Sequence, residues 1–328
     1  MPSQYMELAT GTLGGFLVLD YTFGIDLLLD AEPRMRFAQY VTRVDKPGAK
    51  VGETVTVPTI GTMDLSGTTA RTEGTALTVE RLTLGSANVS ISEYARALGW
   101  TGKLDAMSWF ELDPRLRRKL LDSYSKTIDA LARAAYFGAA TTGTYVSVAL
   151  GPTTAPGTVY STGTGTGTAT DELTYNVIEH AVDQLRGRDV PPFEDENGEY
   201  YVGLFTPTAL RGLRHDPTYQ NAHLYADART LLRGEDGMLE GVRFASTTNI
   251  PNYAPAGGAT SYPHGIIFGM DAVGRAVAQE MELRLEMDKD SDFGRQKAIA
   301  WISLEGFGAL MTAHVQEVQC LAGKYNVQ

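Results

Sequence analysis

One long amphipathic helix, predicted over Asp113 to Phe137, constrains the fold of this chain more than any other stretch. Asp113 can accept hydrogen bonds from the first free amides, Pro114 suits the first helical position, and Gly138 marks the expected end. Apolar residues recur at spacings of three and four on one face. That face consists of Leu116, Leu120, Tyr124, Ile128, Leu131 and Ala135, and the polar positions include Arg117, Arg118, Asp122, Ser125 and Asp129. At about 1.5 Å per residue the helix would span roughly 35 Å, enough to brace a flat molecule from edge to edge.

The region before this helix, residues 46–92, has the composition of a β-hairpin. A turn at Pro47 and Gly48 precedes one β-branched run, further runs return toward residue 91, and residues 61–76 between them are rich in Gly, Thr and Ser. The strand positions are Val51, Val55, Val57, Leu77, Val79, Val89 and Ile91. A two-stranded ribbon is only marginally stable in water and its open edges invite pairing, so we expect a partner chain; the alternative is a surface loop.

Residues 1–45 do not contain enough apolar sequence for a unit of their own. Short apolar patches, such as Leu13–Leu19 and Ile25–Leu29, alternate with glycines. We expect this segment to lie over another surface, either its own domain or a neighbouring subunit.

The charge and cysteine content exclude several classes of protein. The 328 residues carry a net charge of −11, which disfavours a surface that grips nucleic acid, and Cys320 as the only cysteine allows no internal disulfide and no cysteine zinc cluster. The start has no basic segment, and the apolar run Phe16–Leu19 is too short for a signal or a membrane span. We expect a folded protein of a reducing cytoplasm, without a membrane segment.

Beyond the helix, the sequence predicts an uncharged tract and then alternating strands and helices. Residues 138–170 are dominated by Thr and Gly without the lysine of a phosphate-binding loop, so we interpret them as a surface loop or flexible insertion. Gly306 and Gly308 are expected to mark a bend or bulge in the last, mainly antiparallel, part. The expected helices are 173–186 and 206–213, and the expected strands are 200–205, 241–245, 266–269, 281–287, 298–304 and 315–318.

No group of residues has the pattern of an active site. The five histidines are scattered, no Gly-x-Ser-x-Gly nucleophile turn occurs, and Cys320 lies in an apolar strand typical of a buried thiol. Asp288, Asp290 and Asp292 resemble a calcium loop, but Phe293 stands where that loop needs glycine. We therefore expect no catalytic residue, no metal and no cofactor.

Many short segments, in order along most of the chain, resemble the major capsid proteins of tailed bacteriophages, most closely the branch typified by the coliphage called N-four. These segments are Val55–Ile60, Thr72–Thr75, Glu93–Tyr94, Ser123–Ala135, Tyr201–Thr206, Asp216, Tyr225–Leu232, Gly234–Glu235, Gly237, Glu240–Phe244, Phe268–Gly269, Ala272–Gly274, Asp292–Arg295, Trp301 and Gly306–Gly308.

This resemblance implies an α+β fold of the Hong Kong 97 type with four parts. Residues 1–45 would be an N-terminal arm and 46–92 an extended loop. Residues 93–140 with 278–308 would form a peripheral domain around the spine helix 113–137, and 141–277 with 309–328 an axial domain. The strands around 281–305 would return beside the spine helix.

The resemblance also implies a structural protein that assembles into hexamers and pentamers of an icosahedral head enclosing double-stranded DNA, without sequence-specific DNA binding. A portal and decoration proteins are expected partners, and because the chain begins with the arm, a scaffolding protein is expected as a separate chain. The protein would lie in the host cytoplasm before assembly and in the virion afterwards. No covalent crosslink is expected, since residues 51–77 contain no lysine.

Contacts between subunits are predicted at eight residues of the arm, the loop and the late hairpin. They are Phe16, Leu17, Val55, Val57, Ile60, Glu73, Leu77 and Arg295. Two other functions remain open from the sequence: a soluble α/β hydrolytic enzyme, which needs a pocket of perturbed residues, and a phage decoration or tail component, which would be a compact module without the spine helix.

Overall fold

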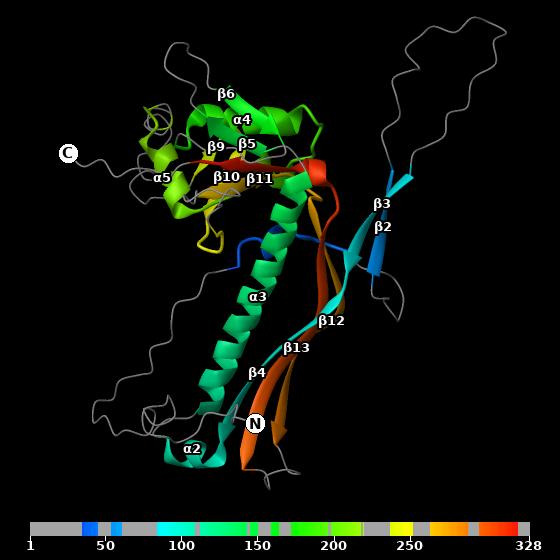
Figure 1. The fold of residues 1–328 in the computed structure, drawn as a ribbon, viewed down its shortest axis with the longest axis vertical. Coiled ribbons are helices and arrows are strands. Elements are labelled where there is room, and N and C mark those ends of the chain that lie inside the picture. Colours follow the sequence, from blue (N-terminus) through cyan, green and yellow to red (C-terminus); the bar gives the residue numbers. More distant parts are fainter. Residues whose placement is uncertain are drawn as a thin grey trace, which may run out of the picture.

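The computed structural model of this chain describes residues 35–44, 54–60, 84–108, 112–142, 145–149, 159–163, 172–195, 198–217, 219, 237–251, 263–287 and 295–320. Within them, a long helix, α3 (Leu112–Thr142), joins a broad head to a narrow stem (Figure 1). The stem combines α3 with a four-stranded sheet, and a two-stranded ribbon projects from its side. The short helix α2 (Gly102–Met107) lies at the foot of the stem.

The predicted helix is confirmed, but its predicted end is wrong. α3 continues through Gly138 to Thr142, four residues beyond that glycine. Tyr136 and Ala139 are fully buried in the core of the head, together with Phe37 and Phe268. Packing of this last turn outweighs the roughly 1 kcal/mol by which glycine disfavours a helix interior.

Gly138→Ala is therefore expected to stabilise the protein by about 0.5–1 kcal/mol, because an added Cβ meets nothing within 4 Å and alanine restricts the unfolded chain. Denaturant unfolding of the purified protein measures the change. Gly212→Ala in α5 (Pro207–His215) is the matched control: its Cβ would lie 3.0 Å from Leu173 N, so it should destabilise. A lower unfolding free energy for Gly138→Ala would contradict this account of the helix end.

The stem sheet has the strand order β1-β12-β13-β4. β12 (Val273–Met287), β13 (Gln296–Ala309) and β4 (Ser92–Thr101) are antiparallel neighbours, whereas β1 (Thr42–Arg43) adds a short parallel edge. Trp100, Ile299 and Trp301 pack against Leu120 and its neighbours on α3. The strand pair that was expected beside the helix lies there.

β4 (Ser92–Thr101) extends the predicted β region, residues 46–92, by the nine residues 93–101, which the sequence pattern did not identify. Its outward residues include Glu93, Ala95 and Ala97, which are exposed and have low strand propensity. The strand forms because the whole of it, Ser92 to Thr101, pairs with β13. Tertiary pairing here outweighs local preference.

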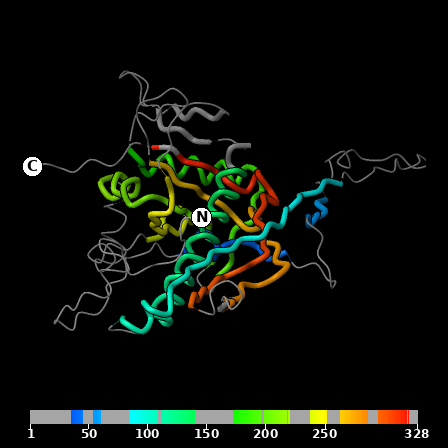
Figure 2. The backbone as a smooth tube through the Cα atoms, turned by 60° about the horizontal axis from the view of Figure 1, so that its bottom comes forward, coloured from blue at the N-terminus to red at the C-terminus, as the bar shows by residue number. Residues whose placement is uncertain are grey.

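The ribbon consists of β2 (Thr54–Ile60) and β3 (Leu84–Ser90), paired in register from Thr54–Ser90 to Ile60–Leu84. β3 passes into β4 through the single residue Ile91, and the two strands follow one nearly continuous line (Figure 2). The ribbon is thus an extension of the stem's edge strand.

The head contains an eight-stranded sheet of described residues, in the order β6-β5-β14-β11-β8-β10-β9, with β7 paired to β8. α4 (Tyr175–Arg186) and α5 pack against this sheet through one apolar core. The strands are β5 (Tyr145–Ala149), β6 (Val159–Gly163), β7 (Phe193–Asp195), β8 (Gly198–Phe205), β9 (Met238–Leu239), β10 (Val242–Ser246), β11 (His264–Phe268) and β14 (Val315–Gln319). The expected helices and strands of the head are confirmed to within a few residues at their ends. In the stem, the expected strand 281–287 begins eight residues earlier, as β12.

Part of the Thr- and Gly-rich tract was assigned wrongly as a loop. β5 and β6 form an antiparallel pair, and β5 also pairs in parallel with β14 at the edge of the head sheet. β5 has the sequence Tyr-Val-Ser-Val-Ala and β6 begins with Val-Tyr, both of which favour a strand, but the Thr and Gly residues around them obscured this local pattern.

Candidate assembly surfaces

The far end of the described ribbon presents apolar side chains to solvent. Ile60 and Leu84 face each other across the two strands, with exposed fractions of 67% and 72%. At the other end of the ribbon, Val55 is 3% exposed and packs with Val89 and Ala276. The ribbon therefore packs against its own subunit around Val55, whereas the side chains of Ile60 and Leu84 remain exposed in the described structure.

The predicted contact residues fall into four groups. Ile60 and Arg295 are exposed and Val57 is partly buried, whereas Val55 belongs to the subunit's own apolar cluster. The predictions Phe16, Leu17, Glu73 and Leu77 lie outside the described residues.

Two glycines allow the ribbon to cross the stem sheet at close range. A Cβ on Gly306 would lie 2.0 Å from Ser90 O, and one on Gly308 would lie 3.0 Å from Asn88 O. Both residues pair regularly with β12, whose own register shifts fall between Val277 and Glu282. The nearest register shift, between Val277 and Gln279, lies opposite Glu305 and Leu304, so the predicted bulge falls beside these glycines and not on them. Their function is to let β3 pass directly over β13, and their i, i+2 spacing, which places both on one face, was the available signal.

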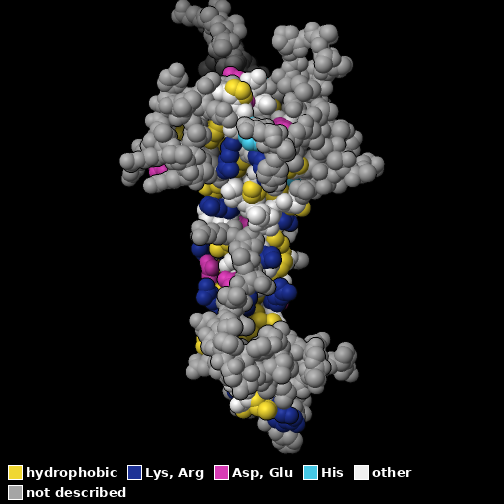
Figure 3. Space-filling view, turned by 90° about the vertical axis from the view of Figure 1, so that its left-hand side faces the viewer, with side chains coloured by type: hydrophobic (Ala, Val, Ile, Leu, Met, Phe, Trp, Pro, Cys, Tyr) yellow, Lys and Arg dark blue, Asp and Glu magenta, His cyan; other side chains and the backbone are white. Residues whose placement is uncertain are grey.

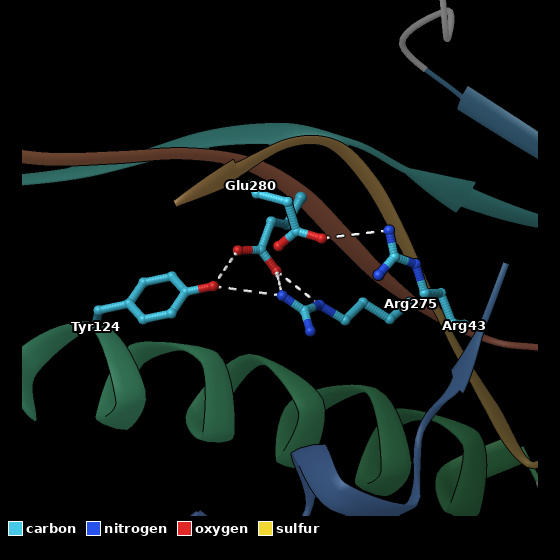
Figure 4. Close-up of polar contacts among 5 residues, drawn as sticks. Arg43, Tyr124, Arg275 and Glu280 are labelled. Carbon is cyan, nitrogen blue, oxygen red and sulfur yellow. Dashed lines mark hydrogen bonds and ion pairs between the residues drawn. The ribbon is translucent and has the colours of Figure 1, made fainter. Parts of the chain in front are cut away.

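The buried carboxylate of Glu305, next to Gly306 in β13, ties the stem sheet to α3; Figure 4 labels its partners Tyr124 and Arg275. Glu305 is 0% exposed, accepts a hydrogen bond from the Tyr124 hydroxyl at 2.7 Å and forms an ion pair with Arg275 at 2.6 Å. Burial, reinforced by the hydrogen bond to Glu305, raises the pKa of Tyr124 far above its usual value, so the phenol stays protonated and donates. Nearby, Arg43 of β1 pairs with Glu280 of β12 at 3.2 Å.

Asp129 fastens the segment that enters the head from the arm. The sequence pattern placed Asp129 on the polar side of the helix, but it is 2% exposed. Its Oδ1 accepts backbone hydrogen bonds from Arg36, Phe37 and Ala38 at 2.8, 2.8 and 3.3 Å. Its Oδ2 accepts one from Asn249 Nδ2 at 2.6 Å. The sequence around Asp129 does not indicate that its carboxylate fastens the arm segment, because its hydrogen-bond partners lie about 90 and 120 residues away in the chain.

The described residues contain no group of three or more His, Cys, Asp or Glu side chains arranged to hold a metal ion. The acidic turn at Asp288, Asp290 and Asp292 lies outside them. None of the helices in the described ranges combines the length and apolarity required to cross a membrane.

Cys320 is fully buried at the end of β14, and burial raises the pKa of its thiol to about 12. We expect iodoacetamide at pH 8 to alkylate the native protein roughly a thousandfold more slowly than the unfolded protein, because the thiolate is the reactive form. Mass spectrometry of samples quenched over time, with and without guanidinium, measures both rates. Equal rates would show that the thiol is accessible.

The architecture is that of the Hong Kong 97-type capsid proteins of tailed phages: a spine helix beside a long-stranded sheet, a separate head and a projecting ribbon. Solved capsid structures of other phages share it, and three of them illustrate the similarity to this chain. The capsid of Ralstonia phage GP4 matches with a TM-score of 0.69 at 16% identity, covering 98% of this chain and 100% of that one. The capsid of cyanophage P-SCSP1u matches with 0.66 at 15% identity, covering 93% of each chain. The acid-stable capsid of Helicobacter pylori bacteriophage KHP30 matches with 0.64 at 13% identity, covering 96% and 99%.

A family model described as phage capsid protein matches residues 35–308. The chain therefore belongs to the phage capsid protein family. A comparison with curated proteins gives no match. Family and fold together support a structural component of the virion of a tailed phage, as the sequence indicated, and not an enzyme.

Proposed function

We propose that this protein is the major capsid protein of a tailed phage and assembles into the hexamers and pentamers of an icosahedral head around double-stranded DNA. The observation that carries this proposal is the ribbon, whose last described pair, Ile60 and Leu84, is apolar and exposed in the single subunit. An exposed apolar pair at the end of a two-stranded ribbon is stabilised by burial against another copy. Head-to-tail contacts of this kind close into rings.

Several finer points belong to the same proposal. The division into arm, extended loop, peripheral domain and axial domain is retained, with β12 and β13 running across the boundaries at residues 277 and 308. The kinship with the N-four branch, the separate scaffolding protein, the portal and decoration partners, and a cytoplasmic stage before assembly rest on the sequence resemblance. The predicted contacts are retained except Val55, whose side chain packs within its own subunit.

Electron microscopy of the expressed protein, alone and with its scaffolding partner, tests the proposal by looking for closed shells. The double variant Ile60→Asp with Leu84→Asp should remain folded by circular dichroism but form no shells. The matched control, Ile60→Leu with Leu84→Ile, keeps both positions apolar and should assemble. Wild-type protein that stays monomeric under both conditions would overturn the proposal.

A further inference from the structure

Residues 35–44, which we name the strap, cross the molecule where the broad head meets the narrow stem. In Figure 1 this dark blue segment passes α3 and runs toward the base of the ribbon, and Figure 3 shows the narrowing from the side of α3. The strap contains the short helix η1 (Ala38–Tyr40) and the strand β1. Within ten residues it touches α3, the head, the stem sheet and the base of the ribbon.

The first end of the strap is fixed to α3 and to the head. Asp129 Oδ1 accepts hydrogen bonds from three consecutive amides of the strap, and Phe37 is fully buried in the core that α3 shares with the head sheet. The Tyr136 hydroxyl donates to Tyr40 O at 3.0 Å. The ring of Tyr40 meets that of Phe268 edge-on, with the centroids 5.8 Å apart. This end of the strap is therefore held by α3 and the head together.

The last end of the strap is part of the support of the ribbon. Val44 N donates to Arg275 O at 2.8 Å, directly after the pairing of β1 with β12. The Val44 side chain packs against the apolar cluster at the base of the ribbon, which includes Val55 and Val89. A Cβ placed on Gly274 would lie 2.9 Å from Val44 Cγ2, so this side chain lies close against β12. The strap thus supplies part of the surface on which the ribbon packs.

The middle of the strap is held by contacts at the protein surface. Thr42 Oγ1 donates to Asp271 Oδ1 at 2.9 Å, and Arg43 forms an ion pair with Glu280 at 3.2 Å, with side chains 58% and 62% exposed. Exposed ion pairs contribute little to stability. The pairing of β1 with β12 covers only two residue pairs. The two buried ends therefore contribute most to holding the strap in place.

We propose that the strap couples these two sites, so that the ribbon keeps its position on the stem only while the strap is seated on Asp129. The inference rests on the proposed capsid function, because the ribbon carries the proposed contact at Ile60 and Leu84, and it adds a conformational control to that contact. A two-stranded ribbon is only marginally stable in water, so its position depends on the cluster at its base. A strap that leaves Asp129 takes Val44 out of that cluster.

The test measures amide hydrogen exchange in the full-length, unassembled protein by mass spectrometry. Asp129→Asn removes one of the two acceptor oxygens, and we expect exchange in the ribbon peptides 54–60 and 84–90 to become at least about tenfold faster. The controls Ile178→Val and Ile178→Ala remove buried carbon atoms from a head cluster that contains no strap residue. They should bracket the stability loss of Asp129→Asn and leave ribbon exchange within about twofold of wild type.

Two further variants test the coupling independently. Tyr136→Phe removes only the hydrogen bond to Tyr40 O, so it should accelerate ribbon exchange by about threefold even if Asp129→Asn does not fold. Val44→Ala loosens the other end of the strap. Because coupling between two sites is reciprocal, this variant should also accelerate exchange of the three amides that Asp129 holds.

Unchanged ribbon exchange in both Asp129→Asn and Tyr136→Phe would overturn the inference. An equal acceleration in the Ile178 controls would overturn it as well, since it would show a general loosening of the protein. Normal exchange of the strap amides in Val44→Ala would contradict the coupling from the other side. Exchange in the unassembled protein does not depend on shell formation, so a wild type that forms no shells by microscopy would count against the proposed function and leave the coupling result standing.

Discussion

Replacing Gly306 with alanine is expected to lower the free energy of unfolding by about 3 kcal/mol or more. The new Cβ would lie 2.0 Å from Ser90 O and 2.7 Å from Ser90 C, both backbone atoms. No side-chain rotation relieves this overlap, so β3 must move away from β13 and expose the cluster around Val89. Guanidinium unfolding followed by tryptophan fluorescence measures the loss, since Trp100 and Trp301 lie in the stem core.

Gly308→Ala is the matched control for Gly306→Ala. It stands two residues further along the same face of β13, but its nearest atom, Asn88 O, is 3.0 Å away, and a shift of a few tenths of an ångström suffices. We expect a loss of about 1 kcal/mol. Similar losses for both variants, or none for Gly306→Ala, would show that the crossing is not the reason for these glycines.

Asp129→Ala is expected to cost about 3–5 kcal/mol, because it removes the acceptor for three backbone N–H groups and for Asn249 Nδ2 inside the protein. Equilibrium unfolding measures the cost, and faster proteolytic cleavage within residues 35–44 should accompany it, since those amides are held by this carboxylate.

Two further variants separate the hydrogen bonds of Asp129 from its position on the helix. Asp129→Asn keeps one acceptor oxygen and the side-chain volume, so we expect an intermediate loss. Asp122→Ala removes a carboxylate from the outer face of the same helix and should change stability by less than about 0.5 kcal/mol. An unfolding free energy for Asp129→Ala within 1 kcal/mol of wild type would contradict the role assigned to the carboxylate.

The fold could be predicted from the sequence where local patterns and tertiary packing agree. The spine helix, α4, α5 and most strands of the head have apolar periodicities that match their burial. The predicted helix end failed at Gly138 because a local glycine signal competed with the burial of Ala139. Strand β4 was missed because pairing with β13, and not its own composition, holds it in place. Strand β5 was missed because its short Tyr-Val-Ser-Val-Ala run lies within a tract dominated by Thr and Gly.

The polar contacts of the stem were beyond the reach of sequence patterns. Tyr124, Arg275 and Glu305 are separated by 30 to 181 residues, and their types are common on protein surfaces. Only the folded chain brings a carboxylate with no exposed surface between an arginine and a phenol, where an unpaired charge would be strongly destabilising.

Because only Ile91 separates β3 from β4, the ribbon and the edge strand of the stem form one nearly continuous strand. A flexible loop would deform under a force exerted by a neighbouring molecule. Here, a force on the ribbon is transmitted along the backbone to the ten residue pairs between β4 and β13. From β13 it reaches α3 through Trp301 and Glu305. A force applied to the ribbon is thereby distributed along the stem, and the buried Ile91 is the residue through which it passes from β3 to β4.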